Sequence, residues 1–170
     1  VKRALAFDMK VYVYDPYIDH EKINKSGAIA IENFKDNLPK MDAITLHCPK
    51  NEETTNLFTK NEFQKMKKDA FIINCARGGI LNEEDLYEAL LNEKIAGAGL
   101  DVFDIEPTPS SNPLFKLKNV ILSPHIAGVT VDSTVRMATE TVQNVLDVFD
   151  NKINQSVVVN NKEIGMWWKN

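Results

Sequence analysis

Three ionisable side chains between residues 77 and 125 could act together on a small anionic substrate: Arg77, Glu106 and His125. The guanidinium of Arg77 is planar and permanently charged, which suits the binding of a carboxylate. Histidine gives and takes protons near neutral pH, so His125 is a candidate acid or base. A carboxylate such as that of Glu106 can hold an imidazole in one tautomer and stabilise its charged form. Taken singly, each of the three is also an ordinary loop residue.

The three residues share a position, because each follows a short apolar run of strand type. Two earlier runs also end in a polar residue. In an open parallel sheet the carboxyl ends of the strands meet at one edge, where ligands bind. We therefore expect a ligand crevice at that edge. The runs and the polar residues at their ends are 11–14 with Asp15, 43–46 with His47, 71–73 with Asn74 to Arg77, 97–102 with Asp101 and then Glu106 in the following loop, and 120–122 with His125.

Helical patterns separate these strand-type runs. Thr59 and Glu62 have capping-box spacing at the start of a short helix that ends near residue 66. Asn82 is placed to cap a helix that ends near residue 92, and a longer amphipathic helix of about twenty residues begins at Thr130. Alternating strands and helices predict an α/β fold with a doubly wound parallel sheet of Rossmann type. Further expected elements are a helix ending near residue 7 and strands at 28–31 and 157–159.

Composition excludes several classes of protein. The net charge is −4, from 20 basic and 24 acidic residues without a block of one sign, which argues against nucleic acid or a membrane surface as partner. No run of apolar residues in the sequence is long enough to span a bilayer. Two cysteines, Cys48 and Cys75, cannot build a disulfide framework, and no Cys/His cluster has zinc spacing. We expect a cytoplasmic protein without a metal site.

Asp15 bears on the choice of cofactor. A carboxylate after the second strand of a nucleotide-binding unit accepts hydrogen bonds from ribose hydroxyls and repels a 2′-phosphate, which favours NAD over NADP. Alone, the residue could equally make a turn with Pro16. The Gly-rich phosphate loop expected before such a strand is not in the sequence, because the only glycine before Ala28 is Gly27.

Three motifs resemble those of the D-isomer-specific 2-hydroxyacid dehydrogenases, and most closely the D-3-phosphoglycerate dehydrogenase-like branch. They are NCARGG at 74–79, GLDVFDIEP at 99–107 and SPHIAG at 123–128. The resemblance runs from residue 1 to about residue 159. It implies an NAD-dependent, reversible reduction of a 2-oxo acid, in which Arg77 holds the substrate, His125 donates the proton and Glu106 keeps His125 charged until then.

The same resemblance implies which residues contact NAD. Asp15 and Pro16 match the adenosine-ribose position, and Cys48, Pro49 and Thr54 resemble the segment along the ribose and phosphates. Other matches lie near the nicotinamide, and Gly128 closes the loop after His125. The full set of predicted cofactor contacts is Asp15, Pro16, His47, Cys48, Pro49, Thr54, Cys75, Ala76, Arg77, Asp101, His125 and Gly128.

The resemblance also implies a domain plan for an N-terminally truncated chain. Residues 1–129 form an NAD-binding domain that lacks the first strand and the Gly-rich loop. Residues 130–170 form a crossover helix and a return segment to a missing substrate domain, with Trp167 and Trp168 packing on something outside this chain. Such a fragment is expected to bind NADH weakly and to be weakly active or inactive, and the parent protein to form a homodimer through its cofactor domain.

The sequence leaves one alternative open, and Glu106 argues against a second. The first is a non-catalytic, NAD-sensing protein on the same fold, like the corepressors that resemble this family and can keep all three residues. The second is formate dehydrogenase, which usually has Gln at the position of Glu106 because its reaction transfers no proton. The sequence does not identify the hydroxy acid, and phosphoglycerate, glycerate, lactate and longer acids all remain candidates.

Overall fold

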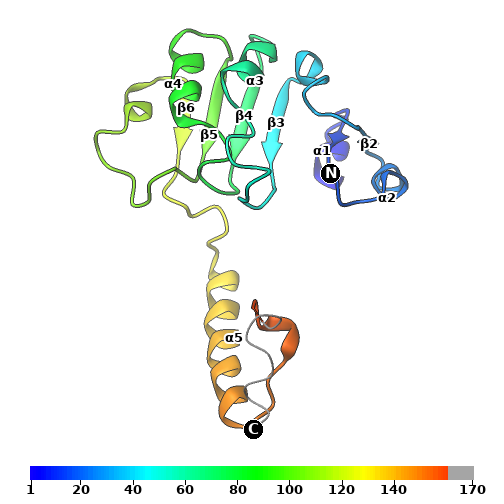
Figure 1. Cartoon of the computed structure of the whole chain (residues 1–170), viewed down its shortest axis with the longest axis vertical. Helices are drawn as coiled ribbons and strands as arrows, with labels where there is room; N and C mark the ends of the chain where they lie inside the picture. Colours follow the sequence, from blue (N-terminus) through cyan, green and yellow to red (C-terminus); the bar gives the residue numbers. More distant parts are fainter. Residues whose placement is uncertain (161–170) are drawn as a thin grey trace. The chain divides into compact units, whose positions relative to one another are not determined.

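The structure is a computed structural model that describes residues 1–160, and it divides into two compact units (Figure 1). The first unit is Val1–His125 and the second begins at Ile126. Each unit is described below by itself.

A four-stranded parallel sheet is the centre of the first unit, in the order β3-β4-β5-β6. Helices α3 and α4 lie over one of its faces and bury an apolar core (Figure 1). Phe58, Phe63, Ile72 and Leu86 are almost inaccessible in that core. The elements are β3 (Ala43–Leu46), α3 (Lys60–Lys65), β4 (Phe71–Asn74), α4 (Glu83–Leu91), β5 (Gly97–Leu100) and β6 (Val120–Leu122), with short 3-10 turns at Leu38–Lys40 and Pro113–Lys116.

The predicted caps begin both helices. The carboxylate of Glu62 accepts hydrogen bonds from the backbone N–H and the hydroxyl of Thr59, at 3.0 and 2.7 Å. The side chain of Asn82 accepts from the N–H of Asp85 at 3.0 Å. Each contact gives a partner to groups that the first turn of a helix cannot pair internally. One boundary was predicted wrongly: the fifth strand ends at Leu100, so Asp101 and Val102 begin the loop.

A smaller parallel sheet pairs β1 (Tyr12–Val13) with β2 (Ile29–Ala30). Helix α2 (His20–Lys25) connects these two strands, and α1 (Lys2–Ala6) precedes them. Both strands are shorter than the predicted runs at 11–14 and 28–31. Phe34 joins this part to the main core, because its ring contacts the rings of Tyr14 and Phe58, with centroids 5.4 and 5.3 Å away. The parallel strands and connecting helices make the predicted Rossmann-type α/β fold.

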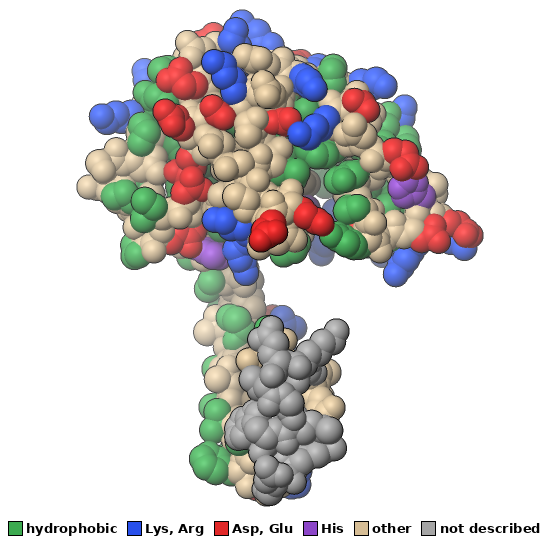
Figure 2. All heavy atoms as spheres, viewed as in Figure 1, with side chains coloured by type: hydrophobic (Ala, Val, Ile, Leu, Met, Phe, Trp, Pro, Cys, Tyr) green, Lys and Arg blue, Asp and Glu red, His purple; other side chains and the backbone are tan. Residues whose placement is uncertain are grey.

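The second unit contains α5 (Val131–Phe149), which begins at the predicted cap Thr130. The apolar stripe of this helix is exposed, as the hydrophobic side chains along it show (Figure 2). The predicted strand at 157–159 is wrong: the segment forms a 3-10 turn, Gln155–Val157, in which the side chain of Asn154 accepts from the N–H of Ser156. Trp167 and Trp168 lie outside the described residues. Within residues 1–160 no helix is long and apolar enough to cross a membrane.

Candidate functional site

The turn after β4 carries Arg77 and is built around the side chain of Asn74. This asparagine is buried, with 2% of its surface exposed. Its Oδ1 accepts from the N–H of Ala76 at 3.0 Å, and its Nδ2 donates to the carbonyl of Arg77 at 2.9 Å. The Arg77 side chain is exposed, and its Nη1 donates to the carbonyl of Ala76 at 2.6 Å. Arg77 therefore projects from a firmly held turn while its guanidinium stays accessible.

His125 and Glu106 form a hydrogen-bonded pair at the same edge of the sheet. The Nδ1 of His125 lies 2.8 Å from Oε2 of Glu106, whose Oε1 accepts from the N–H of Phe103 at 2.9 Å. The bond from His125, followed by that from Phe103, lowers the pKa of Glu106 below its ordinary value. A carboxylate can only accept, so Nδ1 carries the proton and the other ring nitrogen, Nε2, is left to face a reactant.

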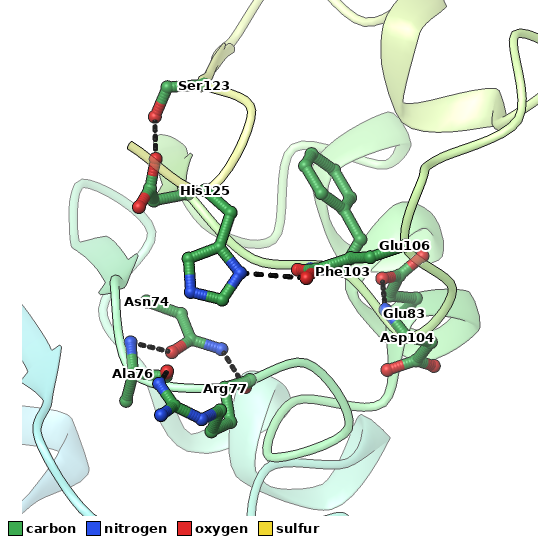
Figure 3. Close-up of polar contacts among 10 residues, drawn as sticks. Asn74, Ala76, Arg77, Glu83, Phe103, Asp104, Glu106, Ser123 and His125 are labelled. Carbon is green, nitrogen blue, oxygen red and sulfur yellow. Dashed lines mark hydrogen bonds and ion pairs between the residues drawn. The ribbon is translucent and has the colours of Figure 1, made fainter. Parts of the chain in front are cut away.

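The loops of β4, β5 and β6 converge, as Figure 3 shows. There the ring of His125 points into the space between Glu106 and the turn that carries Arg77. The backbones of two loops touch at Gly78, where a Cβ atom would lie 1.8 Å from the carbonyl oxygen of Phe103. Only glycine permits this approach. The chain thus brings a guanidinium, an imidazole and a carboxylate together from three consecutive loops.

Asp101, in the loop after β5, is buried, with 2% of its surface exposed. Its carboxylate accepts from the hydroxyl of Ser123 at 2.5 Å, and its N–H donates to the carbonyl of Asn74 at 3.0 Å. Of the other residues predicted near the nicotinamide, Cys75 is exposed and Ala76 is half-buried.

The loop after β3 holds the next group of predicted cofactor residues. His47 is exposed, with Nε2 3.0 Å from the hydroxyl of Thr45. Cys48 is half-buried, and that burial, opposed by a hydrogen bond to its own backbone, raises the pKa of its thiol. A thiol of that kind is a poor nucleophile. The hydroxyl of Thr54 donates to the carbonyl of Pro49 at 2.6 Å, which closes the loop into a compact turn.

Asp15 and Pro16 line a separate open cavity of about 410 Å³ after β1. One carboxylate oxygen of Asp15 accepts from the N–H of Tyr17 at 2.9 Å, which leaves the second oxygen available to a ligand. The hydroxyl of Tyr17 donates to Glu53 at 2.5 Å and connects this cavity to the loop after β3. The bond to Glu53 also raises the pKa of Tyr17. The other lining residues are Tyr14, Ile18, Asp19, His20, Ile31 and Glu32.

The predicted residues therefore fall into three groups. Arg77, Glu106 and His125 come together with Asp101 at the carboxyl edge of the main sheet, the β3 loop residues form a turn, and Asp15 with Pro16 lines the cavity. Gly128 belongs to the second unit, and only its own surroundings are described: its carbonyl accepts from the hydroxyl of Ser133 at 2.8 Å. Among residues 1–160 no group of His, Cys, Asp or Glu is arranged to hold a metal ion.

Sequence reasoning missed two polar residues of the site, Asn74 as a turn-forming side chain and Ser123 as a partner of Asp101. Asn74 is the first polar residue after an apolar strand, which was a usable signal because asparagine often bonds to the backbone two residues on. The bond from Ser123 joins loops 22 residues apart and had no sequence signal.

Residues 1–127 match a sequence family described as "D-isomer specific 2-hydroxyacid dehydrogenase, NAD binding domain". The D-3-phosphoglycerate dehydrogenase of Archaeoglobus fulgidus is 38% identical over 147 residues, which are 86% of this chain and 28% of that protein. The glyoxylate reductase of Thermofilum pendens is 37% identical over 163 residues, 96% of this chain and 48% of that protein.

A solved structure of D-lactate dehydrogenase from Aquifex aeolicus, complexed with NAD and lactic acid, has the same fold. Its TM-score is 0.79 at 31% identity, over 89% of this chain and 47% of that one. The chain thus spans between about a quarter and a half of the length of these three proteins.

Proposed function

Because the chain belongs to the D-isomer-specific 2-hydroxyacid dehydrogenases, as an NAD-binding domain of that family, we propose that the protein transfers a hydride between NAD(H) and a D-2-hydroxy acid/2-oxo acid pair. The observation that carries this proposal is the His125–Glu106 pair, 2.8 Å apart, at the sheet edge that also presents Arg77. An acid–base pair beside a carboxylate-binding cation is the set of groups that reduction of a 2-oxo acid requires.

In this proposal Arg77 binds the carboxylate of the 2-oxo acid through its planar fork. Bound NADH would supply the hydride to the carbonyl carbon. As the carbonyl oxygen gains negative charge, His125 gives it the proton from Nε2, and the hydroxy acid forms. Glu106 stabilises the charged imidazole before that step and keeps the ring oriented through the bond to Nδ1. In the reverse direction His125 takes the proton from the hydroxyl group.

The cavity after β1 fits the adenosine part of NAD. Tyr14 and Ile18 give it apolar walls, while the second oxygen of Asp15 can accept from ribose hydroxyls. The carboxylates of Asp15 and Glu32 would both repel a 2′-phosphate, so we propose NAD rather than NADP. We assign the remaining predicted contacts to the cofactor as the family resemblance implies.

We propose the predicted domain plan, with residues 1–129 as the NAD-binding domain and 130–170 as the crossover helix and return segment. The outer edges of β1 and β3 have no strand partner among the described residues. In the doubly wound strand order 3-2-1-4-5-6, β1 and β3 of this chain correspond to strands 2 and 4, and strand 1 lies between them. A parallel strand from outside these residues, followed by a Gly-rich loop, fits that place. Fast hydrogen exchange, in the full-length protein, at the amides of β3 that point away from β4 would refute the presence of this strand.

The substrate, location and assembly are finer proposals. We favour a phosphoglycerate-like hydroxy acid, because several relatives are D-3-phosphoglycerate dehydrogenases. We propose a cytoplasmic protein, since neither cysteine forms a disulfide among the described residues. We also propose a homodimer, which the exposed apolar side chains of α5 support. If light scattering gave the full-length protein the molar mass of a single subunit, that result would contradict the dimer.

The second candidate function is an NAD sensor that does not turn over a substrate, since the same triad could persist in a binding protein. One experiment separates the two. Full-length protein is mixed with NADH and a panel of 2-oxo acids, from glyoxylate, hydroxypyruvate and pyruvate to 3-phosphohydroxypyruvate and bulkier acids, and NADH oxidation is followed by absorbance. Turnover of one acid supports the enzyme. Tight NADH binding without turnover of any acid supports the sensor.

A further inference from the structure

The loops that carry the proposed catalytic groups are joined by a chain of polar contacts to which the proposed mechanism gives no step. It runs from Asn74 at the end of β4, through Asp101 after β5, to Ser123 after β6. We propose that Asn74 and Ser123 are positioning residues, which fix Arg77 and His125 relative to each other through Asp101. The proposal rests on the proposed function for its kinetic consequences, and its structural part can be tested without turnover.

Asn74 controls the turn that carries Arg77. Its two side-chain bonds, to the N–H of Ala76 and the carbonyl of Arg77, hold the backbone of these two residues against the end of β4. The residue has 2% of its surface exposed, so its side chain is not a group that meets the substrate. Its effect on the substrate has to pass through Arg77.

Ser123 controls the loop that carries His125. Its N–H donates to the carbonyl of Leu100 at 2.9 Å and its hydroxyl donates to Asp101 at 2.5 Å, so it is bound at both its backbone and its side chain. Two residues later His125 has a φ of 56°, in the left-handed region that non-glycine residues seldom occupy. Such a conformation persists when the surrounding contacts impose it. The bonds of Ser123, two residues before His125, and the bond from His125 itself to Glu106 are contacts that help to hold it.

Asp101 connects the two halves. Its N–H donates to the backbone of Asn74, and its carboxylate holds Ser123. Two charged groups lie beside the His125 ring, the carboxylate of Glu106 at 2.8 Å and the guanidinium of Arg77 (Figure 3). A change at either end of the chain of contacts would move one catalytic group with respect to the other. Misplacement by about 1 Å can cost on the order of 10²-fold in rate.

The kinetic test uses two variants that should fail in different ways. Ser123→Ala in the full-length enzyme should lower kcat about 10- to 100-fold, with the KM for the 2-oxo acid changed by less than about 3-fold, because it loosens the proton donor. Ser123→Thr retains the hydroxyl and should restore most of kcat. Asn74→Ala should raise the KM for the 2-oxo acid about 10-fold or more, because it loosens the carboxylate-binding turn. If Asn74→Ala does not fold, Asn74→Ser can be used instead. It replaces the amide oxygen and nitrogen by a single hydroxyl and should also raise the KM for the 2-oxo acid.

Matched controls separate positioning from general loss of stability. Ser26→Ala removes a hydroxyl that donates to the carbonyl of Ile23 at 2.6 Å, far along the chain from the site. Asn119→Ala removes an amide that donates to the carbonyl of Leu90 at 3.2 Å, at the opposite end of the main sheet. Both controls should keep the wild-type kcat and KM. The proposal is overturned if Ser123→Ala and Asn74→Ala lower only the melting temperature, or if Ser123→Thr does no better than Ser123→Ala.

A spectroscopic measurement tests the same idea without a substrate. The Nδ1 proton of His125, bound to Glu106, should give a downfield proton resonance that disappears in His125→Gln. We expect this resonance to be present in the wild type and in Ser123→Thr, and broadened or absent in Ser123→Ala. An unchanged resonance in Ser123→Ala would contradict the positioning role even if the wild type turned over no 2-oxo acid, in which case the proposed function would fail separately.

Discussion

The two ends of the proposed cofactor crevice are built differently. At the end that carries Arg77, Glu106 and His125, buried Asn74 and Asp101 bind three loops to one another. At the other end Asp15 follows a strand of only two residues, half-buried, in a sheet of two strands. The proposed catalytic groups thus stand on loops that are bonded to one another, whereas the proposed adenosine cavity depends on a few contacts to the rest of the unit.

Those few contacts can be named. Phe34 packs its ring between Tyr14 and Phe58, and Lys35 donates to Glu62 at 2.9 Å. Tyr17 adds the bond to Glu53. Single substitutions at the proposed catalytic end should therefore lower turnover sharply, whereas substitutions at the proposed adenosine end should cause smaller changes in cofactor affinity and stability.

The largest effect is expected at His125. In the full-length protein His125→Gln should lower kcat about 10²- to 10⁴-fold, because the glutamine amide cannot deliver the proton. NADH affinity, measured by fluorescence titration, should change by less than about 3-fold, since the imidazole acts on the substrate oxygen. A large loss of NADH affinity with little change in kcat would assign His125 a structural role.

The next effect is expected at Arg77. Arg77→Lys keeps the charge and loses the planar fork, so the KM for the 2-oxo acid should rise about 10- to 100-fold in steady-state kinetics. Arg136→Lys, on the exposed surface of α5, is the matched control and should have wild-type kinetics. Equal kinetics for Arg77→Lys and the control would remove Arg77 from substrate binding.

At the proposed adenosine end, Asp15→Ala should raise the KM for NADH about 10-fold, because it removes the acceptor of the ribose hydroxyls. It should also reduce the preference for NADH over NADPH, because it removes a charge that repels a 2′-phosphate. Asp36→Ala removes an exposed carboxylate outside the cavity and should leave both values unchanged. An unchanged preference in Asp15→Ala would place the adenosine elsewhere.

The smallest effect concerns the ion pair that joins the two ends. Burial of Glu62 alone would raise its pKa, but the bonds from Lys35 and Thr59 lower that pKa to about 2. A carboxyl group with a depressed pKa stabilises the fold above its unfolded pKa and loses that contribution as the pH falls towards 2. Unfolding free energy should therefore decrease between about pH 5 and pH 2.

Removing the partner should move this acid transition. Lys35→Met should raise the pH at which stability is lost and cost about 1–3 kcal/mol at neutral pH, since a nearly buried carboxylate is left with fewer partners. Lys25→Met breaks the exposed pair with Glu21 and should cost less than about 1 kcal/mol. Denaturant titrations at several pH values measure both, and equal costs for the two variants would contradict the account.

The same contrast explains what could be predicted from the sequence. β3, β4 and β6, the caps at Thr59 and Asn82, and the long helix from Thr130 all follow local rules of periodicity and capping. Local rules overestimated β1 and β2, because strand length depends on pairing with other strands. They also predicted a strand at 157–159. That prediction failed because three valines favour a strand only where another strand pairs with them.

The site was predictable to the extent that it follows strand ends. The positions of Arg77, Glu106 and His125 after consecutive strands predicted that they would approach one another, and in the structure they do. The bond between Ser123 and Asp101 and the contact of Gly78 with Phe103 join distant segments, so no local pattern could indicate them.

In the proposed reaction, hydride moves from NADH to the carbonyl carbon of a 2-oxo acid on the face that gives the D-hydroxy acid. The most direct measurement uses full-length protein with NADH deuterated at the transferring position of C4, and examines the product by mass spectrometry and chiral chromatography. We expect a D-2-hydroxy acid that carries one deuterium at C2, formed about 10²- to 10⁴-fold more slowly by His125→Gln than by the wild type. An unlabelled product, an L-hydroxy acid, or bound NADH that is never consumed would contradict it.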